Sequence, residues 1–98
     1  MTVRVVFRRE ARGEFDEAHD WYECQQPGRG DRFAERVEEV LARIAALPRL
    51  HQCVYLDVRR ALVRDFPYLI LYRVLPKQIR VIAVFHTRRD PTIWQSRI

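Results

Sequence analysis

The sequence predicts an α+β fold in which an antiparallel helix hairpin packs on a twisted, mainly antiparallel sheet, in the order β-α-α-β-β-β. Three observations lead to this prediction. Apolar residues recur at helical spacing between residues 31 and 47, and apolar residues alternate with other residues near the N-terminus. Three runs rich in β-branched and aromatic residues fill most of residues 58–85. The 98 residues suffice for one hydrophobic core, so we expect a single domain spanning residues 1–98.

The N-terminal part predicts a strand followed by a helix. In TVRVVFR, Val3, Val5 and Phe7 occupy alternate positions, which is typical of a strand with one buried face. The next segment, EARGEFDEAHDWYECQQ, places Phe15 and Tyr22 on one helical face and carries many acidic side chains on the others. The sequence PGRG at residues 27–30 is expected to end this helix.

The second helix has the strongest periodic signal in the chain. It is expected to begin at Asp31 as the N-cap and to end at Pro48. Its apolar positions follow an i, i+4, i+7, i+8 stripe: Phe33, Val37, Val40, Leu41, Ile44 and Leu47. A loop of about five residues between the two helices predicts an antiparallel hairpin with one shared apolar face.

The second half predicts a three-stranded meander of residues 58–65, 68–75 and 79–85. The register that gives one wholly apolar face has the pairs Val74–Ile79, Tyr72–Val81, Ile70–Ala83 and Tyr68–Phe85. The opposite face then mixes aliphatic and basic side chains: Leu69, Leu71, Ile82 and Val84 with Arg73, Arg80 and His86, joined by Arg60 and Arg64. Such a mixed surface indicates a binding face.

The basic surplus lies in the C-terminal part of the chain. The net charge is +5, but residues 1–58 hold 9 basic and 11 acidic side chains, whereas residues 59–98 hold 9 basic and 2 acidic ones. A polyanion or a very acidic protein would complement this half. A soluble protein that merely has a high pI is the alternative.

Other classes of protein are not indicated. No apolar run approaches the roughly 20 residues that a membrane-spanning helix needs, and no signal peptide is evident, so we expect a cytoplasmic protein that does not bind membranes. Cys24 and Cys53 have neither CxxC spacing nor zinc-type histidine partners. We expect them to be small core residues, with no disulfide and no metal.

The element order and several segments resemble the RelE/ParE superfamily of toxins from bacterial type II toxin–antitoxin modules, often described as plasmid stabilisation proteins. The most specific segments are RDFPYLILYRV and AVFHTRRDP, and the resemblance extends over nearly the whole chain. It implies a cytoplasmic toxin that needs no cofactor, arrests bacterial growth and is neutralised by a cognate antitoxin. It also implies a toxin–antitoxin hetero-oligomer that contacts operator DNA through the antitoxin.

The resemblance leaves two cellular targets open. RelE-like members cleave messenger RNA on the ribosome without a metal, and under this hypothesis Arg64, His86 and Arg88 would be catalytic. Histidine suits proton transfer near neutral pH, and arginines stabilise the crowded phosphorane. The lysine pair of many RelE-like enzymes is missing, since Lys77, in a predicted turn, is the only lysine.

ParE-like members inhibit DNA gyrase, and the long helix hairpin with the HTRRDP ending favours this branch. The residues predicted to bind the target or the antitoxin are Arg59, Arg60, Arg73, Arg80, Arg89 and Trp94. His86 would then be a binding or structural residue, and Trp94 is read first as a core or docking aromatic, with stacking on a base or a partner side chain as the alternative. A degenerate, non-toxic module that only binds an antitoxin is a third hypothesis.

Overall fold

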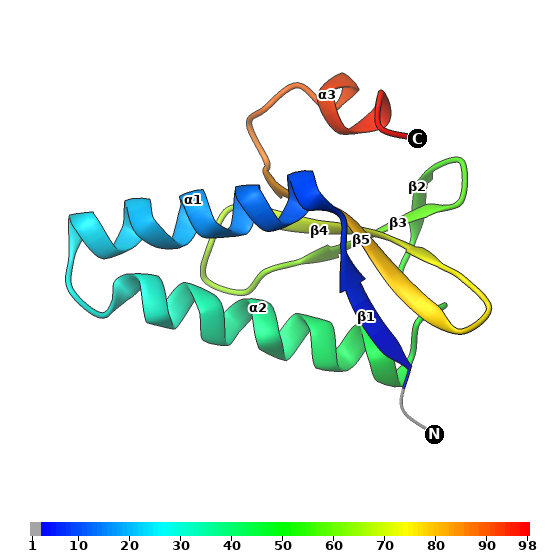
Figure 1. Cartoon of the computed structure of the whole chain (residues 1–98), viewed down its shortest axis with the longest axis horizontal. Coiled ribbons are helices and arrows are strands. Elements are labelled where there is room, and N and C mark those ends of the chain that lie inside the picture. The colour runs from blue at the N-terminus through cyan, green and yellow to red at the C-terminus, as the bar shows by residue number, and fades with distance from the viewer. Residues whose placement is uncertain (1–2) are drawn as a thin grey trace.

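The computed structural model of the chain describes residues 3–98, which form a five-stranded sheet, two long helices and one short helix (Figure 1). The strands are β1 (Arg4–Phe7), β2 (Cys53–Tyr55), β3 (Val58–Leu62), β4 (Tyr68–Val74) and β5 (Gln78–His86). The helices are α1 (Arg9–Gln25), α2 (Arg29–Ala46) and α3 (Thr92–Gln95). None of the described helices has the length and apolar character that crossing a membrane requires.

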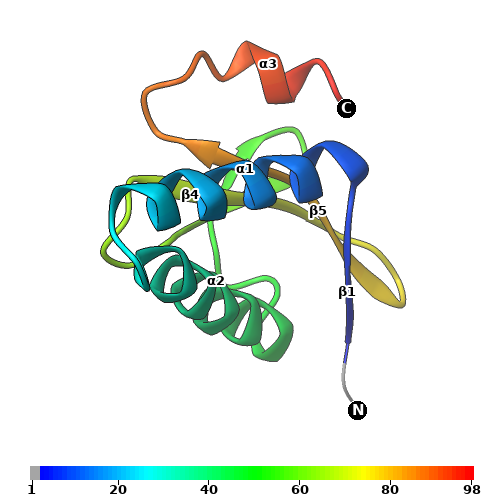
Figure 2. The ribbon, with the colours of Figure 1, turned by 60° about the vertical axis from the view of Figure 1, so that its left-hand side comes forward.

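The sheet has the strand order β1-β5-β4-β3-β2, and Figure 2 shows helix α1 lying across β4 and β5. Strand β1 runs parallel to β5, and all other neighbouring strands are antiparallel. The α+β class, the helix hairpin and the C-terminal meander are therefore confirmed. The short strand β2, which pairs with β3 at the sheet edge, was not predicted from the sequence.

The main core lies between the helix hairpin and one face of the sheet. Phe33 and Ile44 of α2 pack in the same apolar cluster as Ile70 and Tyr72 of β4, and all four side chains are fully buried. The Tyr72 hydroxyl donates a hydrogen bond of 2.8 Å to the carbonyl oxygen of Pro48. A buried hydroxyl without such a partner would destabilise the fold. This bond also fixes the chain just after α2.

Helix α2 begins three residues earlier than the sequence predicted. Its N-cap is Gly28, whose φ of 89° lies in the left-handed region that glycine tolerates. The Glu23 carboxylate accepts hydrogen bonds from the backbone N–H groups of Gly28 and Gly30, at 2.8 and 3.0 Å. Asp31 is therefore not the N-cap, because a side chain of α1 already supplies the acceptor for the first turn.

The predicted register of the β4–β5 hairpin is correct near its turn and wrong beyond it. Val74 pairs with Ile79 and Tyr72 with Val81, as expected. The register then shifts by one residue, so that Leu71 pairs with Ala83, Ile70 with Val84 and Tyr68 with His86. A bulge at Ile82 explains the shift, because one extra residue reverses the side-chain alternation of the rest of the strand. His86 and Val84 consequently lie on the helix side, and Phe85 lies on the opposite face.

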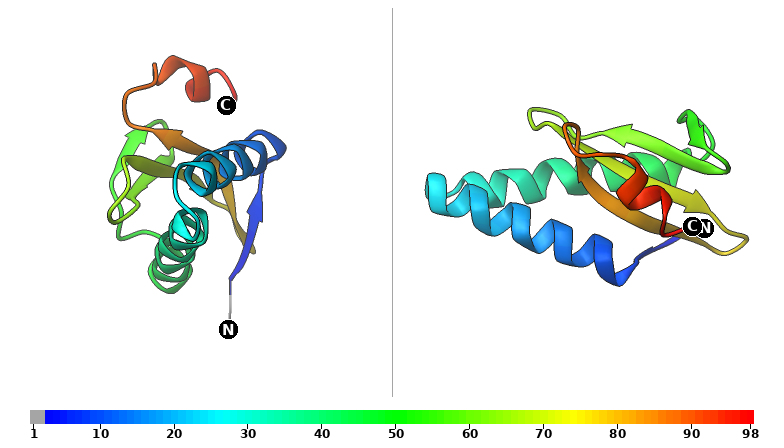
Figure 3. Two further views of the ribbon diagram at one scale, coloured as in Figure 1. Left: turned by 90° about the vertical axis from the view of Figure 1, so that its left-hand side faces the viewer. Right: turned by 90° about the horizontal axis from the view of Figure 1, so that it is seen from above.

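The opposite face of the sheet is largely covered, which corrects the prediction of an open basic surface. Trp94 of α3 packs with Val58, Leu71, Ile82, Ala83 and Phe85 in a second apolar cluster. Figure 3 shows α3 on the side of the sheet that faces away from α2. Sequence alternation alone did not reveal this, since α3 is only four residues long.

Both cysteines are exposed free thiols, so the expectation that they are core residues is wrong. Cys24 lies in the last turn of α1, and Cys53 lies on the edge strand β2. An edge strand that has solvent on its open side buries little of its side chains.

Candidate functional site

His86 ends strand β5 directly opposite Tyr68 of β4. The two rings make an edge-to-face contact with their centroids 5.2 Å apart. The Nδ1 atom of His86 accepts a hydrogen bond of 3.1 Å from the backbone N–H of Arg88. In the neutral imidazole the proton is therefore on Nε2, and this atom is free to donate to a bound group.

A groove of about 790 Å³ lies between α1 and the paired strands at His86. Its apolar lining includes Tyr68 and Trp21, and Trp21 is 59% exposed. Its walls carry both charges, with Arg29 and Arg89 against Glu14 and Glu17. Burial raises the pKa of the Tyr68 hydroxyl, so this group stays a neutral hydrogen-bond donor. The groove can thus hold an amphipathic segment that has apolar side chains and an acidic side chain opposite Arg29.

The Arg29 side chain is held over two aromatic rings at one end of this groove. Its guanidinium carbon lies 5.4 Å from the ring centroid of Tyr22 and 5.8 Å from that of Phe66. Such cation–π contacts limit the rotamers that a surface arginine samples.

Glu14 of α1 joins the groove to the C-terminal tail. Its carboxylate binds Arg89 at 3.0 Å and Arg97 at 2.9 Å, and it accepts a bond of 3.1 Å from the backbone N–H of Val84. Arg97 also donates to the carbonyl oxygen of Ile82, and its hydrogen bond to Glu14 raises its own pKa. Strand β1 pairs only with residues 78–81 of β5. The network therefore satisfies polar groups on the part of β5 that β1 leaves open.

The three residues of the nuclease hypothesis do not line one pocket. His86 lines the groove, but Arg64 and Arg88 do not. The Arg64 guanidinium lies 3.5 Å from the Glu39 carboxylate of α2, and the Arg88 side chain is exposed in the turn after β5. Whether any of them is catalytic stays a prediction.

The residues predicted to bind a target or an antitoxin divide into exposed and structural ones. Arg60 and Arg80 are exposed, and Arg73 pairs with Asp57 at 3.1 Å. Arg59 instead donates to the backbone carbonyl oxygens of Arg49 and His51, and so holds the loop between α2 and β2.

Two residues near the C-terminus have structural contacts, and of these Trp94 was predicted to bind a partner. Trp94 is only 4% exposed and makes an edge contact with Tyr55, with ring centroids 5.8 Å apart. It is a core aromatic in this structure. Asp90 accepts a hydrogen bond of 3.0 Å from the backbone N–H of Thr92 and so closes the turn before α3, whose N-cap is Pro91.

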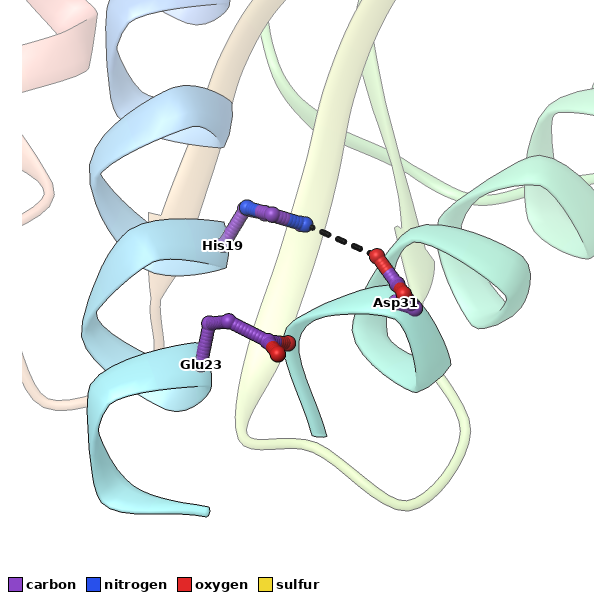
Figure 4. Close-up of side chains that lie close together, drawn as sticks. All are labelled: His19, Glu23 and Asp31. Carbon is purple, nitrogen blue, oxygen red and sulfur yellow. Dashed lines mark hydrogen bonds and ion pairs between the residues drawn. The ribbon is translucent and has the colours of Figure 1, made fainter. Parts of the chain in front are cut away.

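His19, Glu23 and Asp31 gather at the end of the helix hairpin (Figure 4). His19 Nε2 lies 3.2 Å from Asp31 Oδ1, and His19 Nδ1 lies 3.2 Å from Asp20 Oδ1. Hydrogen bonds to Asp20 and Asp31 raise the pKa of His19. Sequence reasoning missed this group, although the i, i+4 spacing of His19 and Glu23 on one helical face was a usable signal.

Comparison with known families and structures gives a consistent assignment. The family described as "ParE toxin of type II toxin-antitoxin system, parDE" matches residues 5–91. Ten chains among the solved structures match. One belongs to the chromosomal ParDE toxin–antitoxin system from P. aeruginosa, with a TM-score of 0.77 and 16% identity, covering 88% of this chain and 97% of that chain. At this identity the likeness shows the shared fold alone. Comparison with curated proteins gives no match. Because the family match covers most of the chain, the protein belongs to the ParE toxin family of type II toxin–antitoxin systems.

Proposed function

We propose that this chain arrests bacterial growth by inhibiting DNA gyrase, and that a cognate antitoxin neutralises it. The observation that carries the proposal is the match to the ParE toxin family over residues 5–91. The match reaches from β1 through all other strands and the helix hairpin to the start of the C-terminal tail.

The groove beside His86 supports an antitoxin as partner. Its exposed apolar side chains, above all Trp21, would be shielded by the apolar face of an amphipathic segment. Arg29 would pair with an acidic residue of the same segment, whereas Arg89 is already paired with Glu14. An acidic amphipathic segment also complements the basic half of the chain.

The arrangement of side chains gives less support to ribonuclease activity. Metal-free RNA cleavage requires a base, an acid and a cationic group within hydrogen-bond reach of one phosphate. Arg64 is paired with Glu39 and does not line the groove that His86 lines. Ribonuclease activity is the second candidate function, and the following experiment distinguishes it from gyrase inhibition.

The test expresses the chain without an antitoxin in a bacterial host and follows an SOS promoter and transcript integrity in the same culture. We expect growth arrest, SOS induction and intact transcripts, because a poisoned gyrase leaves broken DNA. Cleaved transcripts without SOS induction would contradict the gyrase proposal and favour the nuclease. Unaffected growth with a folded chain would favour a degenerate antitoxin-binding module.

Two variants make the same test specific to residues. Arg64→Ala and His86→Ala should leave growth arrest within a few fold of wild type if neither residue is catalytic. A nuclease would lose about a hundredfold or more in cleavage with either variant. Lys77→Ala, in the turn between β4 and β5, is the matched control for loss of a surface cation.

A further inference from the structure

The end of the helix hairpin carries three carboxylates close to one imidazole. Asp20 and Glu23 lie in the last two turns of α1, and Asp31 lies in the first turn of α2, where Arg29 and Arg32 also lie. The turn at residues 26–28 brings Asp31, in the first turn of α2, against the last turns of α1. The result is a local excess of carboxylates around a single imidazole (Figure 4).

The distances within this group fit one small cation. One ligand atom each from His19, Glu23 and Asp31 lies within 4.8 Å of the other two, and His19 Nε2 lies 3.2 Å from Asp31 Oδ1. With metal–ligand bonds of about 2.0 to 2.2 Å, neighbouring ligand atoms of a tetrahedral or octahedral site are about 3.0 to 3.5 Å apart. The His19–Asp31 pair already has this spacing, and a Glu23 oxygen lies within 4.8 Å of both ligand atoms while the carboxylate stays bonded to the first turn of α2.

The ligand side chains are oriented by partners outside the group. Asp20 accepts a hydrogen bond from Nδ1 of His19 and so directs Nε2 toward Asp31. A carboxylate behind a histidine is the usual arrangement around metal-bound imidazoles. The N–H groups of Gly28 and Gly30 each bind one oxygen of Glu23, and each carboxylate oxygen keeps a second lone pair for a cation.

We propose that His19, Glu23 and Asp31 bind a divalent first-row transition metal such as Zn²⁺, which links the end of α1 to the start of α2. One imidazole with two carboxylates suits zinc, cobalt or manganese better than calcium, which prefers oxygen ligands alone. Water completes the coordination sphere, since Asp31 is 77% exposed. A metal binds Nε2 only when that atom carries no proton, so any proton held there is released to solvent on binding.

The metal proposal does not depend on the proposal that gyrase is the target, because the metal ligands are not among the residues predicted to bind a target or antitoxin. Its effect would be on the hairpin itself. A ligand that binds only the folded state raises its stability, so the metal should raise the melting temperature of the chain.

The experiment titrates ZnCl₂ into the purified, chelator-treated chain by isothermal calorimetry and repeats the titration by two-dimensional NMR. We expect one ion per chain with a Kd in the micromolar range and shifts of the Gly28 and Gly30 amide signals. His19→Gln and Asp31→Asn should each weaken binding by about tenfold or more. Circular dichroism of both variants shows whether they remain folded.

Matched controls separate this site from adventitious binding. Glu35→Gln removes one exposed carboxylate elsewhere on α2, and Cys24→Ser removes the thiol next to Glu23; both should bind Zn²⁺ as the wild type does. His51 and His86 are present in every variant, so Zn²⁺ binding that persists in the His19→Gln chain reports non-specific binding to these imidazoles. The proposal is overturned if Zn²⁺ binds the His19→Gln chain as tightly as the wild type, or if the Gly28 and Gly30 signals do not shift.

Discussion

At the scale of single residues, Glu14 and Arg97 form the least exposed ion pair of the described residues. The Glu14 side chain is 10% exposed and binds Arg97, which is 12% exposed, together with Arg89. Glu14→Gln removes the negative charge and leaves Arg97 without a charged partner. Leaving a partly buried charge without its hydrogen-bond partner destabilises a protein, so we expect a loss of about 1 to 3 kcal/mol in the free energy of unfolding. Urea denaturation measures this loss.

Glu10→Gln is the control for Glu14→Gln. Glu10 lies in the same helix and pairs with Arg8, but both side chains are well exposed. Exposed pairs contribute little, so the stability of this variant should match that of the wild type. Equal losses in the two variants would show that Glu14 does not act through its burial.

His51 is predicted to make the folded state sensitive to acid. Burial, followed by the nearby charges of Arg43 and Arg59, lowers its pKa below the usual 6.5. The Nδ1 atom is buried without a hydrogen-bond partner, and the ring contacts Tyr72 edge-on with centroids 6.1 Å apart. The folded state therefore binds a proton at His51 less readily than the unfolded state does.

The sign of the pH effect follows from this difference. Above pH 6.5 His51 is neutral in both the folded and the unfolded chain, so the free energy of unfolding keeps its full value. As the pH falls below 6.5, only the unfolded chain gains the proton, and the free energy of unfolding decreases. Urea denaturation of wild type and His51→Gln between pH 8 and pH 5 should show a steeper decline for the wild type. Identical slopes, or an NMR titration of His51 above pH 6.5, would contradict this prediction.

At the scale of elements, the helix hairpin depends on a close approach at Gly30. A Cβ atom at this position would lie 2.6 Å from the carbonyl oxygen of His19 and 2.8 Å from a Glu23 carboxylate oxygen. Since backbone must move, Gly30→Ala should destabilise the chain by about 1 to 3 kcal/mol. Thermal unfolding followed by circular dichroism measures the effect.

Gly13→Ala is the matched substitution within the other helix. A Cβ atom there has no neighbour within 4 Å, and alanine stabilises a helix interior by about 0.5 to 1 kcal/mol relative to glycine. The two variants should therefore shift the melting temperature in opposite directions. A stabilised Gly30→Ala chain would mean that the hairpin has more room than its contacts indicate.

The sequence predicts correctly the elements that have a periodic apolar pattern. The prediction is wrong where a single residue determines the strand register. Both long helices, the first strand and the meander follow from apolar spacing alone. The bulge at Ile82 does not, because Val81, Ile82, Ala83, Val84 and Phe85 are all apolar and fit either register. Once the bulge is present, His86 changes face. The prediction of an open basic face is therefore wrong for two reasons. The bulge turns His86 to the helix side, and Trp94 covers the opposite face.

The candidate site was predictable only in part, because several of its contacts join residues that are far apart in the sequence. His86, Arg89 and the basic surplus of the second half were identified from residue type and position. Glu14, the groove and the His19 group depend on contacts across as many as 83 residues of sequence, such as that between Glu14 and Arg97. Pairings of this kind are fixed by the tertiary arrangement, which local propensity does not encode.

At the scale of the whole molecule, the sheet is packed on both faces but unequally. The helix hairpin covers one face with the larger apolar cluster, whereas the other face depends on a single large side chain of a four-residue helix. Trp94 is held there by its own packing and by the ion pair between Arg97 and Glu14. The C-terminal tail and the second apolar cluster should therefore lose their order together.

Trp94→Ala tests this dependence. Truncating a buried tryptophan destabilises a protein by about 3 to 5 kcal/mol, because both the apolar contact and the filled volume are lost. Here the variant should also uncover Leu71, Ile82 and Phe85, so the folded chain should bind a hydrophobic dye such as ANS more strongly than wild type. Trp21→Ala is the control, since Trp21 is 59% exposed and its removal should change neither stability nor dye binding appreciably. If Trp94→Ala unfolds at the wild-type urea concentration and binds no more dye, then α3 is not what covers this face in solution, and the basic residues around it are open to a partner.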